Sequence, residues 1–228
     1  MEQELISTGK CIFCNQAFDQ NEIGKHIAKH LSEMEKADHA KATKSYHYIV
    51  VEAGPLFLHL LVQREAKMKI VDNFLRNIWL ECCGHMSNFG HKNFKINMSH
   101  TVRDVFIPKV KIYHDYDYGS TTRVDLKSTK TYELHLKENL TLLSRNEPLK
   151  LICSVCKKLP AAYLCTTCDW DADASFCEKC AAKHEETCED FVDYARMPVV
   201  NSPRMGVCGY EGGTIDKDRD GIYKNKSG

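Results

Sequence analysis

Twelve cysteines in a chain of 228 residues constrain its fold more than any other feature. Most of them stand in pairs separated by two residues, the spacing with which one tight turn aims two sulfur atoms at a single metal ion. The chain begins MEQELIS, without the basic and apolar regions of a signal peptide, and it has no apolar run long enough to span a membrane. We therefore expect a cytoplasmic protein that does not enter the membrane and whose cysteines bind metal instead of forming disulfides.

A first metal site is predicted near the amino terminus, where Cys11 and Cys14 are followed by His26 and His30. The histidines are four residues apart and share one face of a helix, so the four side chains can complete a tetrahedron around zinc. A module of about 30 residues has too small a core to stay folded without the metal. The zinc in this module is therefore expected to be structural.

This spacing resembles that of a two-cysteine, two-histidine zinc finger, with eleven residues between the second cysteine and the first histidine where twelve are usual. Fingers of this type that read DNA contact about 3 base pairs each and usually work in tandem. Here one finger stands alone, and its part of the chain carries no net positive charge. We do not expect it to read a DNA sequence directly.

A denser pattern of ligands covers residues 153–188. It reads C-x2-C-x8-C-x2-C-x8-C-x2-C-x3-H-x3-C, with the ligands Cys153, Cys156, Cys165, Cys168, Cys177, Cys180, His184 and Cys188. Eight ligands predict two tetrahedral zinc sites. The spacing leaves two partitions open: a sequential one, in which the first four and the last four ligands form the sites, and an interleaved one.

The pattern resembles the B-box, ZZ and RING group of cross-braced zinc modules. This resemblance implies the interleaved partition, in which Cys153, Cys156, Cys177 and Cys180 share one ion and the other four ligands share the second. With every coordination position filled, no metal-bound water has a place, so we expect these zincs to be structural as well. Together with the finger, the chain is expected to hold about three zinc ions.

The surroundings of these ligands favour a protein partner over nucleic acid, because acidic side chains repel phosphate. The acidic residues are Asp169, Asp171, Asp173, Glu185, Glu186, Glu189 and Asp190. Apolar residues between the ligands are expected to form a small core. They are Leu159, Tyr163, Leu164, Trp170 and Phe176.

The middle of the chain predicts mixed α and β structure. Two strand-like runs at 46–51 and 56–63, separated by Gly54 and Pro55, predict a β-hairpin. Apolar residues at helical spacing from Ile70 to Cys82 predict an amphipathic helix, with Gly84 as its carboxyl-terminal cap. Further strands are expected at 94–98, 102–107, 111–118, 121–126 and 131–136, with a turn at 119–120. We therefore predict an α+β fold with a small mixed sheet and a packed helix.

Two segments of this middle part, 68–89 (MKIVDNFLRNIWLECCGHMSNF) and 113–127 (YHDYDYGSTTRVDLK), resemble the root-inducing-plasmid ORF-three-like family. That family occurs in bacteria and archaea and is linked with mobile elements. The matching motifs are His85 with Phe89, and the turn 116–119 (YDYG). Segment 201–212 (NSPRMGVCGYEG) is similar to one that accompanies some members. The resemblance implies a compact α+β domain and brings no established reaction with it.

Histidines and aspartates of the middle part suggest an enzymatic alternative, in which one cleft binds a catalytic metal or performs acid–base chemistry. The candidates are His85, His91, His100, Asp115 and Asp117. No spacing among them is diagnostic, so we favour a capping role for His85 and a turn role for Asp117. Cys82 and Cys83 are predicted to be core residues on the helix face, and Cys208 a structural thiol in a glycine-rich turn.

These patterns divide the chain into a finger with a helical linker at 1–44, an α+β domain at 45–150, a two-zinc module at 151–198 and a glycine-rich, charged tail at 199–228. The favoured function is a non-catalytic recognition adaptor with a protein partner; no catalytic residue is assigned. The oligomeric state is left open.

Nucleic-acid binding, associated with a mobile element or its control, is the first alternative, because the middle part is positive with 15 basic and 11 acidic residues, a net charge of +4. It predicts a shared face for Lys67, Lys69, Arg76, Lys92, Lys95, Lys109, Lys111 and Arg123. A metal-dependent phosphodiesterase is the second alternative.

Overall fold

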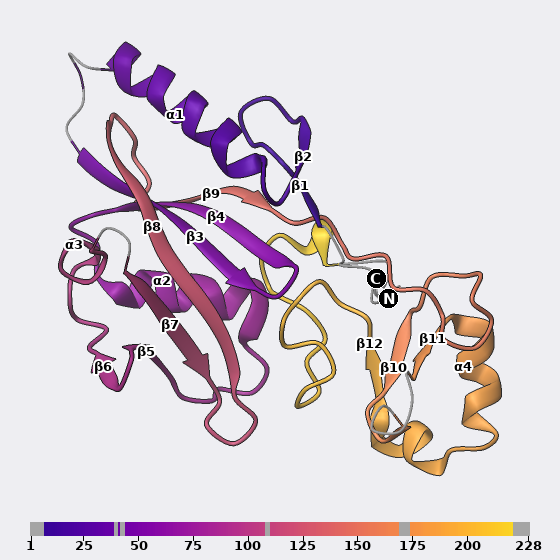
Figure 1. Cartoon of the computed structure of the whole chain (residues 1–228). Coiled ribbons are helices and arrows are strands. Elements are labelled where there is room, and N and C mark those ends of the chain that lie inside the picture. Colours follow the sequence, from indigo (N-terminus) through magenta and orange to yellow (C-terminus); the bar gives the residue numbers. More distant parts are fainter. Residues whose placement is uncertain (1–6, 39–40, 42–43, 108–109, 169–173, 221–228) are drawn as a thin grey trace. The chain divides into compact units, whose positions relative to one another are not determined.

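The computed structural model describes residues 7–38, 41, 44–107, 110–168 and 174–220 (Figure 1). The described residues form two compact units. Unit 1 contains those of 1–75 and 85–147, and unit 2 contains those of 76–84 and 148–228. The division into four parts expected from the sequence stays a prediction.

Unit 1 is built on a seven-stranded sheet in which all neighbouring strands are antiparallel. In spatial order the strands are β6 (Phe94–Ile96), β5 (Ser87–His91), β7 (Lys111–Tyr116), β8 (Thr122–Leu134), β3 (Lys44–Ala53), β4 (Leu56–Gln63) and β9 (Leu140–Arg145). The α+β class is therefore confirmed, but the predicted small mixed sheet is wrong: the sheet is larger than expected and antiparallel throughout, because its strands follow one another in hairpins and short connections.

The predicted hairpin is confirmed as β3 and β4, which pair from Tyr46 and Gln63 to Ala53 and Leu56 around the two-residue turn. Gly54 has φ +57°, a backbone conformation that residues other than glycine rarely adopt. Both strands are buried along most of their length. A strand reads as a continuous apolar run when both faces of its sheet are covered.

Two helices cover the two faces of this sheet (Figure 1). Helix α1 (Ile23–Asp38) packs its buried side chains against Tyr46, Tyr48 and Val50 of β3. Helix α2 (Met68–Leu75) lies on the opposite face, where its Asp72 contacts His114 of β7. Side chains alternate along a strand, so the neighbours of the α1-facing residues point toward α2.

Strand β8 corrects the prediction of two strands at 121–126 and 131–136, because it runs unbroken from Thr122 to Leu134. The pairing with β3 shifts register where Tyr48 opposes Lys130 and Ile49 opposes Ser128. This β-bulge adds one residue to β8, so that the side chains after the bulge point to the opposite faces of the sheet from those expected by simple alternation. Leu126 and Ser128 consequently face α2, whereas Tyr132 packs in the core beneath α1.

The predicted strand at 102–107 is wrong. Its first residues form a short helix, α3 (Val102–Val105), which Thr101 caps by accepting a hydrogen bond from the backbone N–H of Asp104. Strand β7 is shorter than the predicted 111–118, since the chain turns at Asp117, where φ is +65°. Strands β5 and β9 were not predicted.

The predicted amphipathic helix ends earlier than expected. Helix α2 continues into a π-helical turn, η1 (Arg76–Leu80), and the chain leaves the helix before Cys82. The core role predicted for Cys82 and Cys83 is therefore wrong: Cys82 is half-buried and Cys83 is exposed. Gly84 has φ +81° and lies in the turn that follows.

The finger consists of β1 (Thr8–Lys10), β2 (Ala17–Asp19) and α1, the helix expected to carry its histidines. Asp19 starts this helix by accepting backbone hydrogen bonds from Asn21 and Glu22. Ile23, together with other apolar residues of α1, is fully buried in the core shared with the sheet. The finger is thus part of unit 1.

Gly9 allows the finger to approach the sheet closely. A β-carbon at this position would lie 2.7 Å from Phe57 Cζ and 2.9 Å from the carbonyl oxygen of Arg145. We expect Gly9→Ala to lower the free energy of unfolding of unit 1 by about 2 kcal/mol, because a backbone oxygen cannot move away without breaking pairing. Urea denaturation measures this effect. The control is Gly24→Ala, whose new methyl group meets only ordinary contacts, the nearest at 3.5 Å; equal losses in the two variants would contradict the account.

Unit 2 contains a small sheet with strand order β11-β10-β12, formed by β10 (Tyr163–Cys165), β11 (Ser175–Phe176) and β12 (Arg196–Pro198). Helix α4 (Glu178–Glu185) and the π-helical turn η3 (Phe191–Ala195) follow β11. The core between them holds Phe176 and Phe191 with mostly small residues. Of the predicted core, Leu159 is exposed, and Trp170 lies outside the described residues, as do Asp169, Asp171 and Asp173.

The segment 199–220 packs on residues 76–84 of the same unit. Ser202 Oγ donates a hydrogen bond to the carbonyl oxygen of Trp79. The backbone N–H of Thr214 donates a hydrogen bond to the carbonyl oxygen of Asn77. The segment ends in a 3₁₀ turn, η4 (Lys217–Arg219). No helix among the described residues is long and apolar enough to cross a bilayer.

Candidate metal centres

The finger brings its four predicted ligands together. Donor atoms of Cys11, Cys14, His26 and His30 all lie within 4.8 Å of one another. The Nε2 atoms of the two histidines are 3.1 Å apart, and Cys14 Sγ is 3.1 Å from Nε2 of His26. Burial and the neighbouring charge of His30 lower the pKa of His26, which favours the neutral form that binds metal.

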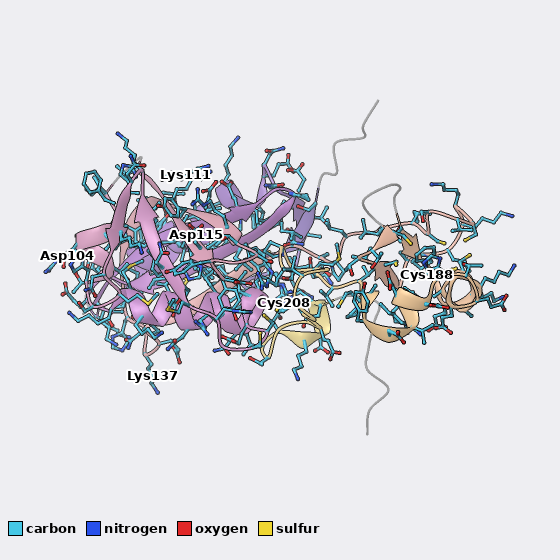
Figure 2. The ribbon with its side chains drawn as sticks, turned by 90° about the horizontal axis from the view of Figure 1, so that it is seen from below. Asp104, Lys111, Asp115, Lys137, Cys188 and Cys208 are labelled. Atoms are coloured by element: carbon cyan, nitrogen blue, oxygen red, sulfur yellow. The ribbon has the colours of Figure 1, made fainter. Side chains whose placement is uncertain are left out.

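The module in unit 2 holds two further groups, and their composition is the interleaved one. One group joins Cys153 and Cys156 to Cys177 and Cys180. The other joins Cys165, Cys168, His184 and Cys188, the last of which is labelled in Figure 2. The segment before β10 and the start of α4 therefore contribute to one site, and the end of β10 with the end of α4 and the residues that follow each contribute to the other.

The backbone supports a thiolate at the first of these groups. Burial by itself raises the pKa of Cys153, but backbone N–H groups of Cys156, Cys177 and Val155 outweigh it and lower the pKa to about 6. Hydrogen bonds from backbone N–H groups to sulfur stabilise the deprotonated form, which is the form that binds metal.

The second group contains a buried nitrogen that a metal would satisfy. His184 Nε2 is buried, and no described residue forms a hydrogen bond with it. The ring stacks on Phe176 at a centroid distance of 4.4 Å, which fixes its orientation. Burial first, and then the neighbouring thiols Cys165 and Cys188, raise the pKa of Cys168 to about 12. A bound cation reverses this effect of crowding, because it stabilises the thiolates.

The distances between sulfur atoms fit metal coordination. In a tetrahedral zinc site with bonds of about 2.3 Å, neighbouring sulfur atoms lie about 3.8 Å apart. The sulfurs of Cys156 and Cys177 are 3.9 Å apart, as are those of Cys168 and Cys188. None of the twelve cysteines is in a disulfide. These groups consist of thiols and imidazoles without carboxylates, the donor set that suits zinc.

A fourth group was missed by the sequence analysis: Cys82, Cys83, His85 and Cys208. With it, the described residues contain four Cys/His clusters consistent with several structural metal sites, and these clusters include all twelve cysteines of the chain. The close sequence positions of the first three ligands were a usable signal. The fourth, Cys208, lies 125 residues after Cys83, and no motif connects them.

The residues proposed for a catalytic cleft do not converge. His91 Nδ1 lies 2.8 Å from the carbonyl oxygen of Lys111, and Asp115 of β7, labelled in Figure 2, forms a two-pronged ion pair with Arg123 of β8. His100 is exposed. Only His85 and Asp117 approach each other, with 3.6 Å between Nε2 and Oδ2.

A buried polar network lies between α2 and the sheet. Asp72 is fully buried and accepts hydrogen bonds from Lys69 and Ser87, while its Oδ1 lies 2.8 Å from Nε2 of His114. Burial acts to raise the pKa of Asp72, but these three partners outweigh it and hold the pKa well below its usual range. These hydrogen bonds compensate the cost of burying the carboxylate between α2 and the sheet.

A cleft of about 360 Å³ lies between α1 and the sheet, and its lining includes Gly24, Tyr48, His59 and Lys127. Burial, followed by the charge of Lys127, lowers the pKa of His59 to about 4. None of the five residues proposed for catalysis lines this cleft. The pocket with converging His and Asp residues that an enzyme would need is therefore not formed by those candidates.

Comparisons with known proteins do not assign a family. No family model matches the chain, and no curated protein matches it. A crystal structure of a protein of unknown function from Methanosarcina mazei Go1 is similar over 43% of this chain and 67% of its own, with 12% sequence identity and a TM-score of 0.37. A likeness this distant carries no argument about function.

Proposed function

We propose that the protein is a zinc-stabilised, non-catalytic recognition adaptor that binds another protein through the module of unit 2. The observation that carries this proposal is the composition of the metal groups, each of which contains four Cys or His donors. Four protein ligands complete a tetrahedral zinc site, so that no position is left for a water or a substrate. Zinc at the finger and the module then shapes surfaces and takes no part in a reaction.

An exposed apolar surface on the module supports protein binding. Val155 lies within the first pair of cysteines and is 62% exposed, and Leu159, which follows that pair, is 43% exposed. The carbonyl oxygen of Leu159 accepts a hydrogen bond from the backbone N–H of Cys153, which closes the loop that carries both residues. Ile152 adds a third exposed apolar side chain. A rigid apolar surface of this kind is typical of a site for another protein.

The interleaved ligand groups and their spacing support a cross-braced module like those of the B-box, ZZ and RING group. The middle of the chain, by its resemblance to the root-inducing-plasmid ORF-three-like family, supports a link with a mobile element or its control. We therefore expect the partner to be a protein of that system. Neither resemblance contributes a reaction.

Affinity purification of the full chain from its native host tests this proposal. We expect Val155→Glu and Leu159→Glu to reduce recovery of the bound protein at least tenfold, because a charge at the centre of an apolar interface must be desolvated. Ile107→Glu is the matched control, since Ile107 is an equally exposed aliphatic residue in unit 1. Zinc content, measured on each variant, shows whether the module stays folded. Equal recovery from all three variants would refute the proposal.

Nucleic-acid binding remains the second candidate, supported by the β5–β6 hairpin. Phe94 is 73% exposed there between Lys92 and Lys95, and Lys95 Nζ lies 5.6 Å from the ring centroid of Tyr118. Exposed aromatic rings beside lysines are the usual platform for single-stranded nucleic acid.

Of the seven described basic residues expected to form a binding face, four are paired with carboxylates, which weakens this second candidate. Lys69 pairs with Asp72, Arg76 with Glu81, Lys111 with Asp125, and Arg123 with Asp115. Lys109 lies outside the described residues. Binding to random DNA and RNA at several salt concentrations tests this candidate, which requires an affinity that falls with salt and is lost in Phe94→Ala.

A further inference from the structure

The three thiols of the fourth Cys/His group combine two distant parts of the chain within unit 2. Cys82 and Cys83 follow the π-helical turn η1, and Cys208, labelled in Figure 2, belongs to the segment 199–220. The Sγ atom of Cys83 lies 3.7 Å from that of Cys82 and 3.7 Å from that of Cys208. Three sulfur atoms therefore surround one point.

These distances indicate coordination and not oxidation. The sulfur atoms of a disulfide lie about 2.05 Å apart, whereas those bound to one tetrahedral zinc lie about 3.8 Å apart. The separations of 3.7 Å agree with the second value. They also match the separations of 3.9 Å found in the two groups of the module.

His85 supplies a fourth donor because Gly84 alone separates it from Cys83. His85 is the first residue after the segment 76–84, so the chain itself keeps it next to Cys83. The carboxylate of Asp117 lies 3.6 Å from His85 Nε2. Carboxylates in this position orient metal-binding histidines and raise their basicity.

Without a metal, the contacts with Cys208 and Cys82 raise the pKa of Cys83 to about 12. A bound cation reverses this effect, and a protein cation also lies close. The buried side chain of Arg204 reaches Cys82, with 3.6 Å between Nη2 and Sγ, and a neighbouring cation favours the thiolate form. Cys208 itself has φ +53°, in the left-handed region, between Gly206 and Gly209, which also have positive φ. Non-glycine residues in this region carry strain of about 1 kcal/mol or more and concentrate at functional sites.

The two segments that carry the thiols are fixed to each other independently of any metal. Ser202 Oγ donates a hydrogen bond of 2.6 Å to the carbonyl oxygen of Trp79. At Gly213, a β-carbon would lie 2.5 Å from the carbonyl oxygen of Ile78, so the backbones are in direct contact. The ligands are therefore preorganised, which lowers the cost of binding a metal.

We infer that Cys82, Cys83, His85 and Cys208 form a fourth structural zinc site, which fastens the segment 199–220 to residues 76–84. A site of three thiolates and one imidazole has the same composition as the second site of the module. Because Cys83 and Cys208 are exposed, this site loses its zinc to a chelator before the other sites of unit 2. The inference does not depend on whether the module binds a protein.

Native mass spectrometry of the full chain, purified under reducing conditions, tests this site. We expect four zinc ions in the unaltered protein, one for each Cys/His group, and three in Cys83→Ser and in Cys208→Ser. Val207→Ser is the matched control, because it changes the neighbouring side chain in the same turn and leaves the ligands in place; it should keep four. Equal zinc counts in the unaltered protein and both cysteine variants would overturn the inference.

Alkylation of the unaltered protein gives a second readout that does not depend on how the variants fold. With zinc bound, Cys82, Cys83 and Cys208 should resist iodoacetamide, and a mild chelator should make them react before the cysteines of the module. Peptide mapping identifies the modified residues. Immediate alkylation without chelator, or a disulfide within this group, would show that no metal is held there.

Discussion

Removing zinc from the full chain is expected to unfold the module of unit 2 and to leave the seven-stranded sheet of unit 1 folded. Structural zinc contributes about 10 kcal/mol or more of folding free energy at each site. The core of the module consists mainly of alanines and two phenylalanines, which cannot replace that contribution. The sheet is buried on both faces of its central strands and does not depend on the metal in the same way.

Hydrogen exchange resolved by peptide measures this difference. After chelation, amides of β10, α4 and β12 should exchange at the rate of unfolded chain, while those of β3 and β4 remain protected. Chelation that leaves the module protected would contradict a structural role for its zinc.

Two double variants of the same module test the interleaved grouping. Cys156→Ser with Cys180→Ser removes two ligands of one group and is expected to lose one zinc ion. Cys156→Ser with Cys168→Ser removes one ligand from each group and is expected to lose two. All three cysteines are half-buried, which makes the variants comparable. A sequential grouping gives the opposite order of zinc losses.

Lowering the pH from about 7 to 4 is expected to destabilise unit 1 by as much as about 6 kcal/mol. His47 and His59 are buried in its sheet. Burial, followed by the charge of Arg64 for His47 and of Lys127 for His59, lowers the pKa of each to about 4. The unfolded chain, in which each pKa returns to 6.5, binds more protons between these values. Stability is therefore complete above pH 6.5 and falls as the pH decreases toward 4.

The hydrogen bonding of His59 explains why its charged form is unfavourable. Nδ1 lies 2.6 Å from the hydroxyl oxygen of Tyr48, and no described residue offers Nε2 a hydrogen-bond partner. A protonated ring would bury a second N–H without an acceptor.

Urea denaturation at a series of pH values, with β3 and β4 followed by hydrogen exchange, measures the acid effect. The control is His59→Gln, which keeps a polar group beside Tyr48 and removes the titration. We expect the pH slope of this variant to be smaller by about 1.4 kcal/mol per pH unit between 4 and 6.5. Zinc loss in acid affects both proteins equally and cancels in the comparison. Identical slopes would show that His59 does not remain neutral in the folded state.

Local patterns in the sequence predicted the parts of the fold that depend on nearby residues. The finger helix, the β3–β4 hairpin and the ligands of the finger and module all follow from spacings within a few dozen residues. In these modules the metal ligands define the fold, so the ligand spacing contains most of the information needed.

Features that depend on tertiary contacts could not be predicted. The residues of β8 between its two predicted strands are polar, and only pairing with β3 and the β-bulge opposite Tyr48 make the strand continuous. The segment 102–107 is rich in β-branched and aromatic residues, which favour a strand, but the capping of α3 by Thr101 determines its conformation.

The group of Cys82, Cys83, His85 and Cys208 could not be predicted from the sequence for a different reason. Cys82 fits the apolar stripe of the predicted helix, and only the π-helical turn η1 ends that helix early enough to release it. Its distant ligand is brought close by backbone contacts between segments 76–84 and 199–220. Neither feature leaves a recognisable spacing in the sequence.

The zinc content of the intact chain is the most direct test of structural metal at both ends of the protein. Native mass spectrometry should find at least three zinc ions bound to the reduced chain, for the finger and the two groups of the module, with a fourth that disappears in Cys83→Ser. Fewer than three ions, or cysteines of the finger or module joined in disulfides, would contradict the account.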